Sequence, residues 1–149
     1  MLFAGQMSNI CTDKTIGDIL AGWRYDISPL APQMRGDYEQ HLRGCDGLMI
    51  ESNHDLEMLR SGPYPWMVKQ RVMSRVGHLS NAALADFFET DYDGQATFLV
   101  LAHLSEQYNH PELARETAYQ ALGSHMNLFQ SCTLTLAQQD KPLQPLCLG

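Results

Sequence analysis

The segment that most constrains the fold of this chain is an apolar run that ends in a histidine. Residues 96–102 read ATFLVLA and are followed directly by His103. A short apolar run of this kind is typical of a buried strand. A buried strand that ends in histidine places an imidazole at the edge of a sheet, where α/β proteins keep their ligand sites. We therefore expect His103 to lie at such a site.

Other strand-like runs also end in polar residues. Asp13 follows one such run, and Glu51 and His54 follow a second. His78 stands two residues before a serine, as His103 does. Carboxylate and imidazole groups together are the ligands of zinc, manganese and non-haem iron. We therefore expect these side chains to meet at one edge of a single sheet, with Glu51 and His54 behind the other three.

The rest of the chain alternates expected strands with expected helices. The strands are expected at residues 8–12, 47–50, 96–102 and 128–136, and the helices at residues 38–43, 55–60, 66–73, 82–88 and 111–122. Asn81 is expected to cap the fourth helix. Pro111 and Gly123 are suited to the beginning and the end of the last one. This alternation predicts an α/β, or layered α+β, fold.

Composition narrows the class of protein. A chain of 149 residues with 44% apolar and 18% charged residues is typical of one soluble globular domain. The net charge of -7 argues against a general nucleic-acid-binding surface. It remains compatible with a nuclease, because bound metal ions offset carboxylates. We expect no membrane span and no signal peptide. Four scattered cysteines without a CxxC pair favour a reduced, cytoplasmic protein.

Five short motifs occur in a fixed order along the chain. They are Thr12-Asp13, LMIESNHD at 48–55, GPYP at 62–65, GHLSN at 77–81 and LAHLSE at 101–106. Together they resemble the C-terminal part of metallo-β-lactamase-fold hydrolases, in particular the bacterial WalJ/YycJ-like proteins, which are regarded as metal-dependent phosphodiesterases or exonucleases. The resemblance implies the C-terminal half of an αββα sandwich. We expect residues 1–149 to form one partial domain of this type, with an insertion or loop near 22–36 and a loose tail at 141–149.

The resemblance also implies roles for single residues. Asp13 matches the carboxylate that bridges two metal ions, and His103 matches a late histidine ligand of the second ion. His78 matches a histidine that protonates the leaving group, while Glu51 and His54 line the cleft and orient the other groups. The expected cofactor is zinc or manganese, and the expected partner is nucleic acid or another phosphodiester substrate.

One family feature is not found. The His-x-His-x-Asp-His ligand cluster is missing, since no two histidines are separated by one residue. We therefore expect weak or partial metal binding by this chain alone. Three hypotheses stay open: a truncated phosphodiesterase, a non-catalytic remnant, and a half-domain subunit. The last would be completed by an N-terminal half-domain partner or by assembly as a homo-oligomer.

Simpler interpretations exist for the same residues. A histidine at a strand end is often structural, and Asp13 suits a turn. Glu51 and His54 would also fit a helix-capping arrangement in which Ser52 or Asn53 is the cap. Half of a sandwich is further expected to leave apolar sheet surface without a partner, around Phe98, Val100 and the strand of Leu48.

Overall fold

A computed structural model describes residues 2–5, 42, 47–74, 77–123 and 132–143 of the chain. Within this part four strands form one sheet in the order β1-β2-β3-β4. The strands are β1 (Leu2–Gly5), β2 (Gly47–Glu51), β3 (Phe98–Ala102) and β4 (Thr133–Leu136). β1 is antiparallel to β2, whereas β2, β3 and β4 are parallel. The described residues thus form the expected α/β fold.

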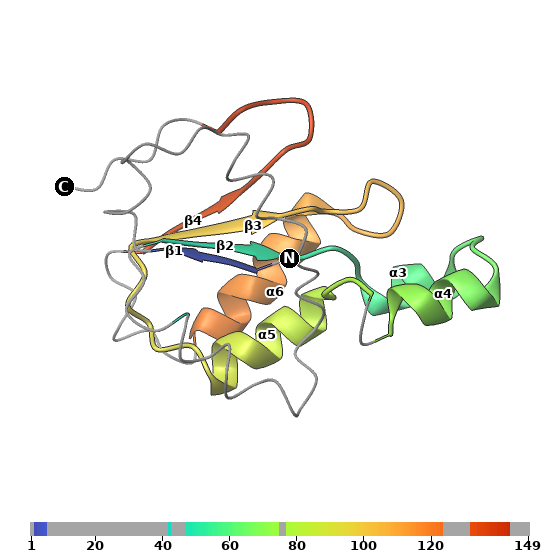
Figure 1. Cartoon of the computed structure of the whole chain (residues 1–149), viewed down its shortest axis with the longest axis horizontal. Coiled ribbons are helices and arrows are strands. Elements are labelled where there is room, and N and C mark those ends of the chain that lie inside the picture. Colours follow the sequence, from blue (N-terminus) through green and yellow to red (C-terminus); the bar gives the residue numbers. More distant parts are fainter. Residues whose placement is uncertain (1, 6–41, 43–46, 75–76, 124–131, 144–149) are drawn as a thin grey trace.

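Four described helices accompany the sheet. They are α3 (Leu56–Ser61), α4 (Trp66–Val72), α5 (Asn81–Thr90) and α6 (Pro111–Gly123). α5 and α6 lie against one face of the sheet, while α3 and α4 project beyond the ends of β2 and β3 (Figure 1). No helix among the described residues is long and apolar enough to cross a membrane.

The core lies between the sheet and the helix pair α5–α6. Alternate residues of the two central strands point toward the helices, because successive side chains of a strand face opposite sides of a sheet. The buried side chains of this layer include Leu48 and Ile50 from β2, Leu99 and Leu101 from β3, and Leu84, Phe87 and Phe88 from α5. α6 contributes the small residues Ala114, Ala118 and Ala121. The close fit holds the ends of β2 and β3 in a fixed position.

The sheet was expected to leave apolar side chains exposed around Phe98, Val100 and the strand of Leu48, and this is wrong for Leu48 and Val100. Leu48 is 2% exposed because it faces the helices, and Val100 on β3 is 4% exposed. Phe98 is half-buried. The described sheet therefore does not leave these residues open to solvent.

The helix caps correct two expectations. The Ser80 side chain, not that of Asn81, caps α5 by accepting a hydrogen bond from the Ala83 N–H at 3.1 Å. Asp55 caps α3 by accepting from the Met58 N–H at 2.9 Å. A capping role with Ser52 or Asn53 as the cap is therefore wrong, since the helix begins only after Asp55.

Several expected features lie outside the described residues. These are the strand at 8–12, the insertion or loop near 22–36, all but residue 42 of the helix at 38–43, and most of the tail at 141–149. Of the last expected strand, residues 133–136 are a strand and residues 128–131 are not described. The strand β1 was not expected.

Candidate functional site

Two parallel neighbouring strands bring Glu51 and His103 to the same edge of the sheet. Glu51 is the last residue of β2 and pairs with Ala102, the last residue of β3. His103 therefore follows immediately beyond the same edge. His78 arrives from a third segment, which lies just before α5. Because the carboxyl ends of parallel strands meet at one edge, residues far apart in sequence converge there.

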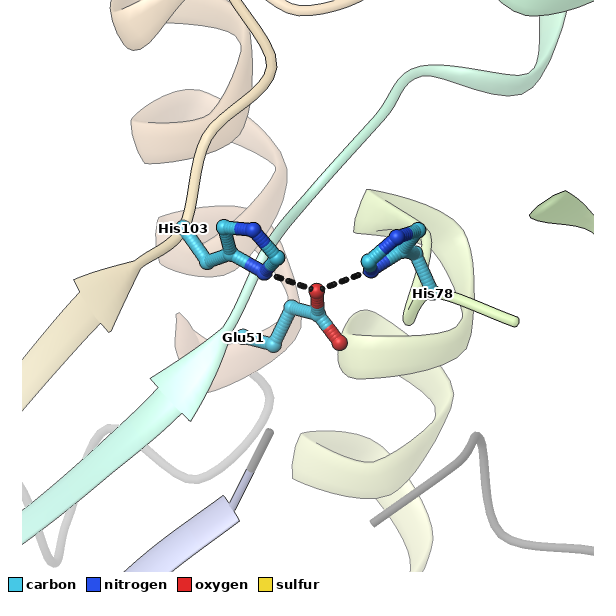
Figure 2. Close-up of side chains that lie close together, drawn as sticks. All are labelled: Glu51, His78 and His103. Carbon is cyan, nitrogen blue, oxygen red and sulfur yellow. Dashed lines mark hydrogen bonds and ion pairs between the residues drawn. The ribbon is translucent and has the colours of Figure 1, made fainter. Parts of the chain in front are cut away.

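A single oxygen of Glu51 joins the two histidines. Oε1 lies 2.7 Å from Nδ1 of His78 and 2.6 Å from Nδ1 of His103. Figure 2 shows the carboxylate between the two rings. The second oxygen, Oε2, accepts a hydrogen bond from the backbone N–H of Leu79 at 3.1 Å. The ring centroids of the histidines are 4.9 Å apart in an edge-to-face arrangement.

The burial of the three side chains is unequal. The Glu51 side chain is 3% exposed, whereas those of His78 and His103 are 42% and 49% exposed. Burial by itself raises the pKa of Glu51, but hydrogen bonding, first of all from His103, together with Coulombic attraction more than offsets it and lowers the pKa to about 2. Glu51 is therefore an anion below the surface that supports two imidazoles facing outward.

The charge of Glu51 fixes the tautomers of the histidines. An ionised carboxylate only accepts hydrogen bonds, so Nδ1 of each ring must carry the proton. Each Nε2 is then left to face the open side of the site. Among the described residues neither Nε2 atom has a hydrogen-bond partner. Such an outward nitrogen is suited to a metal ion or to a substrate oxygen.

The backbone of His103 is held in an unusual conformation. Its φ of 59° makes it the one non-glycine residue with positive φ among the described residues. A residue with a Cβ adopts this left-handed conformation only at a cost. The Asn53 side-chain amide donates to the His103 carbonyl at 2.8 Å, and the Ser105 N–H donates to the Asn53 carbonyl at 2.8 Å. These bonds stabilise the turn that aims the imidazole at Glu51.

A buried polar network holds the surrounding loops together. The amides of Asn81 and Asn109 bond to each other at 2.9 and 3.0 Å, and Ser52 donates its hydroxyl to Asn81 at 2.7 Å. Asn109 also donates to the carbonyls of Ser52 and Asn53, at 2.8 and 3.1 Å. The network thus connects the segment after β2 with the beginning of α5 and with the residues before α6.

These network residues were missed or misassigned from the sequence. No role was predicted for Asn109, and Asn81 was expected to be a helix cap. One signal was present: Ser80 already supplies a good cap, which leaves the asparagine beside it for another role. The pairing of Asn81 with Asn109, 28 residues apart, has no local sequence signature.

His54 lies beside the site without bonding to it. The residue is 1% exposed, and neither ring nitrogen has a hydrogen-bond partner. Burial, followed by the neighbouring His78, lowers the pKa of His54 from 6.5 to about 4, so the ring is neutral at pH 7. His54 lines a pocket of about 350 Å³ together with His78, His103 and Tyr108. The Tyr108 hydroxyl is also buried without a partner.

The structure thus brings together three of the five expected residues. Glu51, His78 and His103 each offer one ligand atom, and these atoms lie within 4.8 Å of one another. Glu51 does not stand behind the histidines, as expected, but between them, because its long side chain reaches past the strand end. The ring of His54 is near but makes no hydrogen bond, and Asp13 lies outside the described residues.

The donor set fits a divalent cation. Two imidazoles and a carboxylate are ligands that zinc and manganese accept. The Nδ1 atoms, however, already contact Glu51 at hydrogen-bond distance. The free Nε2 atoms are therefore the better candidates for coordination, with Glu51 as the group that orients them.

Comparison with known proteins gives relatives over part of the chain. The chain is 42% identical over 81 residues to exodeoxyribonuclease YycJ of Bacillus anthracis. The matched segment makes up 54% of this chain and 31% of the relative. It is 42% identical over 92 residues to exodeoxyribonuclease WalJ of Streptococcus pneumoniae serotype 2, which covers 62% and 33%. The chain therefore spans about a third of the length of these curated relatives. No family model and no solved structure matches. The resemblance to WalJ/YycJ-like proteins is confirmed by these relatives.

Proposed function

We propose that this chain contributes part of the active site of a metal-dependent hydrolase that cleaves phosphodiester bonds in DNA. The observation that carries the proposal is the Glu51 oxygen held between the Nδ1 atoms of His78 and His103. Two relatives named as exodeoxyribonucleases support the choice of substrate. We further propose that the α/β layer described here is the C-terminal layer of a metallo-β-lactamase-type αββα sandwich.

His103 and Asp13 are the proposed metal ligands. Glu51 accepts the Nδ1 proton of His103 and so directs its Nε2 toward the cation, a relationship common in metal sites. A bound divalent cation would polarise the phosphate and lower the pKa of an attacking water. Two ligands are fewer than such an ion requires, so further donors are expected from outside the described residues. Zinc and manganese both suit this donor set.

His78 is the proposed general acid. Glu51 accepts the Nδ1–H of His78 and orients the ring, so that a proton carried on the outward Nε2 can be donated to the departing oxygen. The half-exposed position of the ring gives a substrate access to this atom. His54 is proposed to line the substrate pocket. Its ring is buried and neutral at pH 7, and neither ring nitrogen has a hydrogen-bond partner.

Metal content and turnover together test these assignments. We expect His78→Ala to lower turnover on single-stranded DNA by roughly 10²–10⁴-fold while metal content stays unchanged. Asp13→Ala should lose both metal and activity. His110→Ala, which removes an exposed histidine paired with Glu112, is the matched control and should change neither. Activity is measured by release of nucleotides, and metal content by elemental analysis.

Three outcomes would contradict the proposal. If His78→Ala strips the metal, His78 is a ligand and not the acid. If Asp13→Ala retains the metal, Asp13 is no ligand. If the unmodified chain binds no divalent cation and gives no hydrolysis when supplied with the remainder of the fold, the site is not catalytic.

A further inference from the structure

The α3–α4 hairpin, residues 56–72, projects away from the core. It lies beyond the ends of β2 and β3, apart from α5 and α6 (Figure 1). Every residue from 63 to 68 at its tip is exposed, and Trp66 and Met67 are 64% and 80% exposed. Single apolar residues on a surface need no explanation, but a tryptophan and a methionine side by side at this exposure indicate a contact surface.

The same part of the chain is positively charged. The hairpin holds three cations, Arg60, Lys69 and Arg71, and one anion, Glu57. The whole chain, by contrast, has a net charge of -7. A polyanion is repelled by a negatively charged surface and attracted to a segment of opposite sign.

The individual cations of the hairpin differ in role. Lys69 is buried and donates to the Arg60 carbonyl, so it ties α4 to the end of α3. Arg60 pairs with Glu57. Arg71 is exposed and makes no ion pair with any residue that the structure describes. Arg71 is therefore the cation that is free to contact a phosphate.

The hairpin borders the pocket of the candidate site. Leu59, Tyr64 and Val72 line it from the hairpin, while His78 and His103 line it from the sheet edge. The rings of Tyr64 and Tyr108 pack with centroids 4.4 Å apart. Tyr64 is 39% exposed and stands two residues before Trp66. Aromatic side chains are thus present both in the pocket and on the exposed tip next to it.

We propose that the α3–α4 hairpin binds single-stranded DNA that enters the site, with bases stacked on Trp66 and Tyr64 and a phosphate beside Arg71. This inference rests on the proposed function, because it assigns a substrate class to the same site. Exposed aromatic rings combined with cations are the usual means of binding a single strand, since every base has a face that can stack. Aromatic residues, Met and Arg are also enriched at protein interfaces, but the position of the hairpin beside the pocket of the proposed site favours a strand of substrate. Single-stranded DNA is favoured over a duplex because its bases are free to stack on side chains.

Binding without cleavage tests the proposal directly. Fluorescence anisotropy of a labelled oligonucleotide is measured with the whole chain in the presence of a chelator. We expect Trp66→Ala to raise Kd by roughly 5- to 150-fold, the range for loss of one base stack. We expect Arg71→Gln to reduce the slope of log K against log salt by about 0.7. Tyr119→Ala and Arg115→Gln, at exposed positions on α6, are the matched controls and should bind like the unmodified chain.

Hydrolysis of a small aryl phosphodiester, which is too short to reach the hairpin, separates this inference from the proposed function. If metal-loaded protein cleaves neither the small ester nor DNA but binds DNA through Trp66, the proposed function fails and the inference stands. The inference is overturned if the unmodified chain does not bind the oligonucleotide, or if Trp66→Ala and Tyr119→Ala bind it equally. It is also overturned if Trp66→Ala only converts an oligomer to a monomer in size-exclusion chromatography, because the hairpin is then a protein interface.

Discussion

At the edge of the sheet the Glu51 side chain is 3% exposed, while at the tip of the α3–α4 hairpin Met67 is 80% exposed. Glu51 accepts hydrogen bonds from two segments of the chain, and its neighbours Ser52, Asn81 and Asn109 bond to one another. The hairpin tip has no comparable network among the described residues. Groups that transfer protons or orient ligands must be held in place, whereas groups that capture a flexible strand must be accessible. The two regions border one pocket, so binding and chemistry can be changed separately.

The largest effect is expected at the rigid region. Glu51→Gln keeps the shape of the side chain but replaces the anion by a neutral amide, which no longer offers a charged acceptor to the Nδ1 atoms of His78 and His103. We expect turnover on DNA to fall by roughly 10²–10⁴-fold, measured as kcat of metal-loaded protein. Glu116→Gln, the same change at an exposed position on α6, is the control. Unchanged turnover in Glu51→Gln would mean that the charge of Glu51 does not contribute to the chemistry.

The second effect concerns stability of the same region. Asn109→Ala leaves the Ser52 carbonyl and the side-chain N–H of Asn81 without their partner. Each buried polar group left unpaired costs about 1–3 kcal/mol, so we expect the free energy of unfolding to fall by about 3 kcal/mol in urea denaturation. Gln120→Ala, which removes an exposed amide from α6, should cost less than about 0.5 kcal/mol. Equal losses in the two variants would show that the network does not stabilise the loops.

Much of the fold was predictable because its signals are local. Strands β2 and β3 correspond to short apolar runs, and helices α5 and α6 have a helical periodicity. Each of these patterns lies within a short stretch of sequence, so the periodicity and the turn residues around it are enough to locate the element. The placement of Glu51 and His103 at one edge followed from the same logic, since parallel strands share their carboxyl ends. The position of His78 at this site was predicted from the motif that contains it, and not from a strand or helix periodicity.

The rest depends on long-range pairs that a single sequence does not display. The bond between Asn81 and Asn109 joins residues 28 positions apart, and the bond from Asn53 to the His103 carbonyl spans 50. Histidine adopts the left-handed conformation more often than most residues, but at His103 the conformation is also held by such a long-range partner. The position of Glu51 between the two histidines, and not behind them, also follows from side-chain geometry alone.

The third prediction concerns the pH dependence of stability, which we expect to come from the buried His54 at the sheet edge and not from the hairpin. In the folded chain the pKa of His54 is lowered to about 4, from an ordinary value of 6.5. Between these values the unfolded chain binds a proton that the folded chain does not, so stability falls as pH drops from 6.5 toward 4. The full loss is roughly 3 kcal/mol, and it begins above the range in which carboxylates titrate.

Urea denaturation at pH 7 and pH 5 measures this loss. His54→Gln removes the titrating group, and the difference in stability between the two pH values should shrink even if the variant is less stable at both. Trp66→Ala should keep the full difference, because Trp66 is far more exposed and does not titrate. If His54→Gln keeps the difference as well, other groups cause the acid sensitivity, and the burial of His54 is not its source.

The smallest effect is expected at the hairpin, and it is the one that decides whether the comparison holds. Trp66 is 64% exposed, so its removal takes little apolar surface out of a packed environment. Exposed substitutions away from caps and networks usually change stability by less than about 0.5 kcal/mol. We therefore expect Trp66→Ala to unfold at nearly the same urea concentration as the unmodified chain while it loses affinity for single-stranded DNA. Leu84→Ala in α5, where the side chain is 1% exposed, is the opposite control and should cost about 2–5 kcal/mol. If Trp66→Ala instead destabilises the chain by more than about 2 kcal/mol, the tryptophan packs against something in solution. The hairpin then belongs to the folded core and not to a substrate-binding surface.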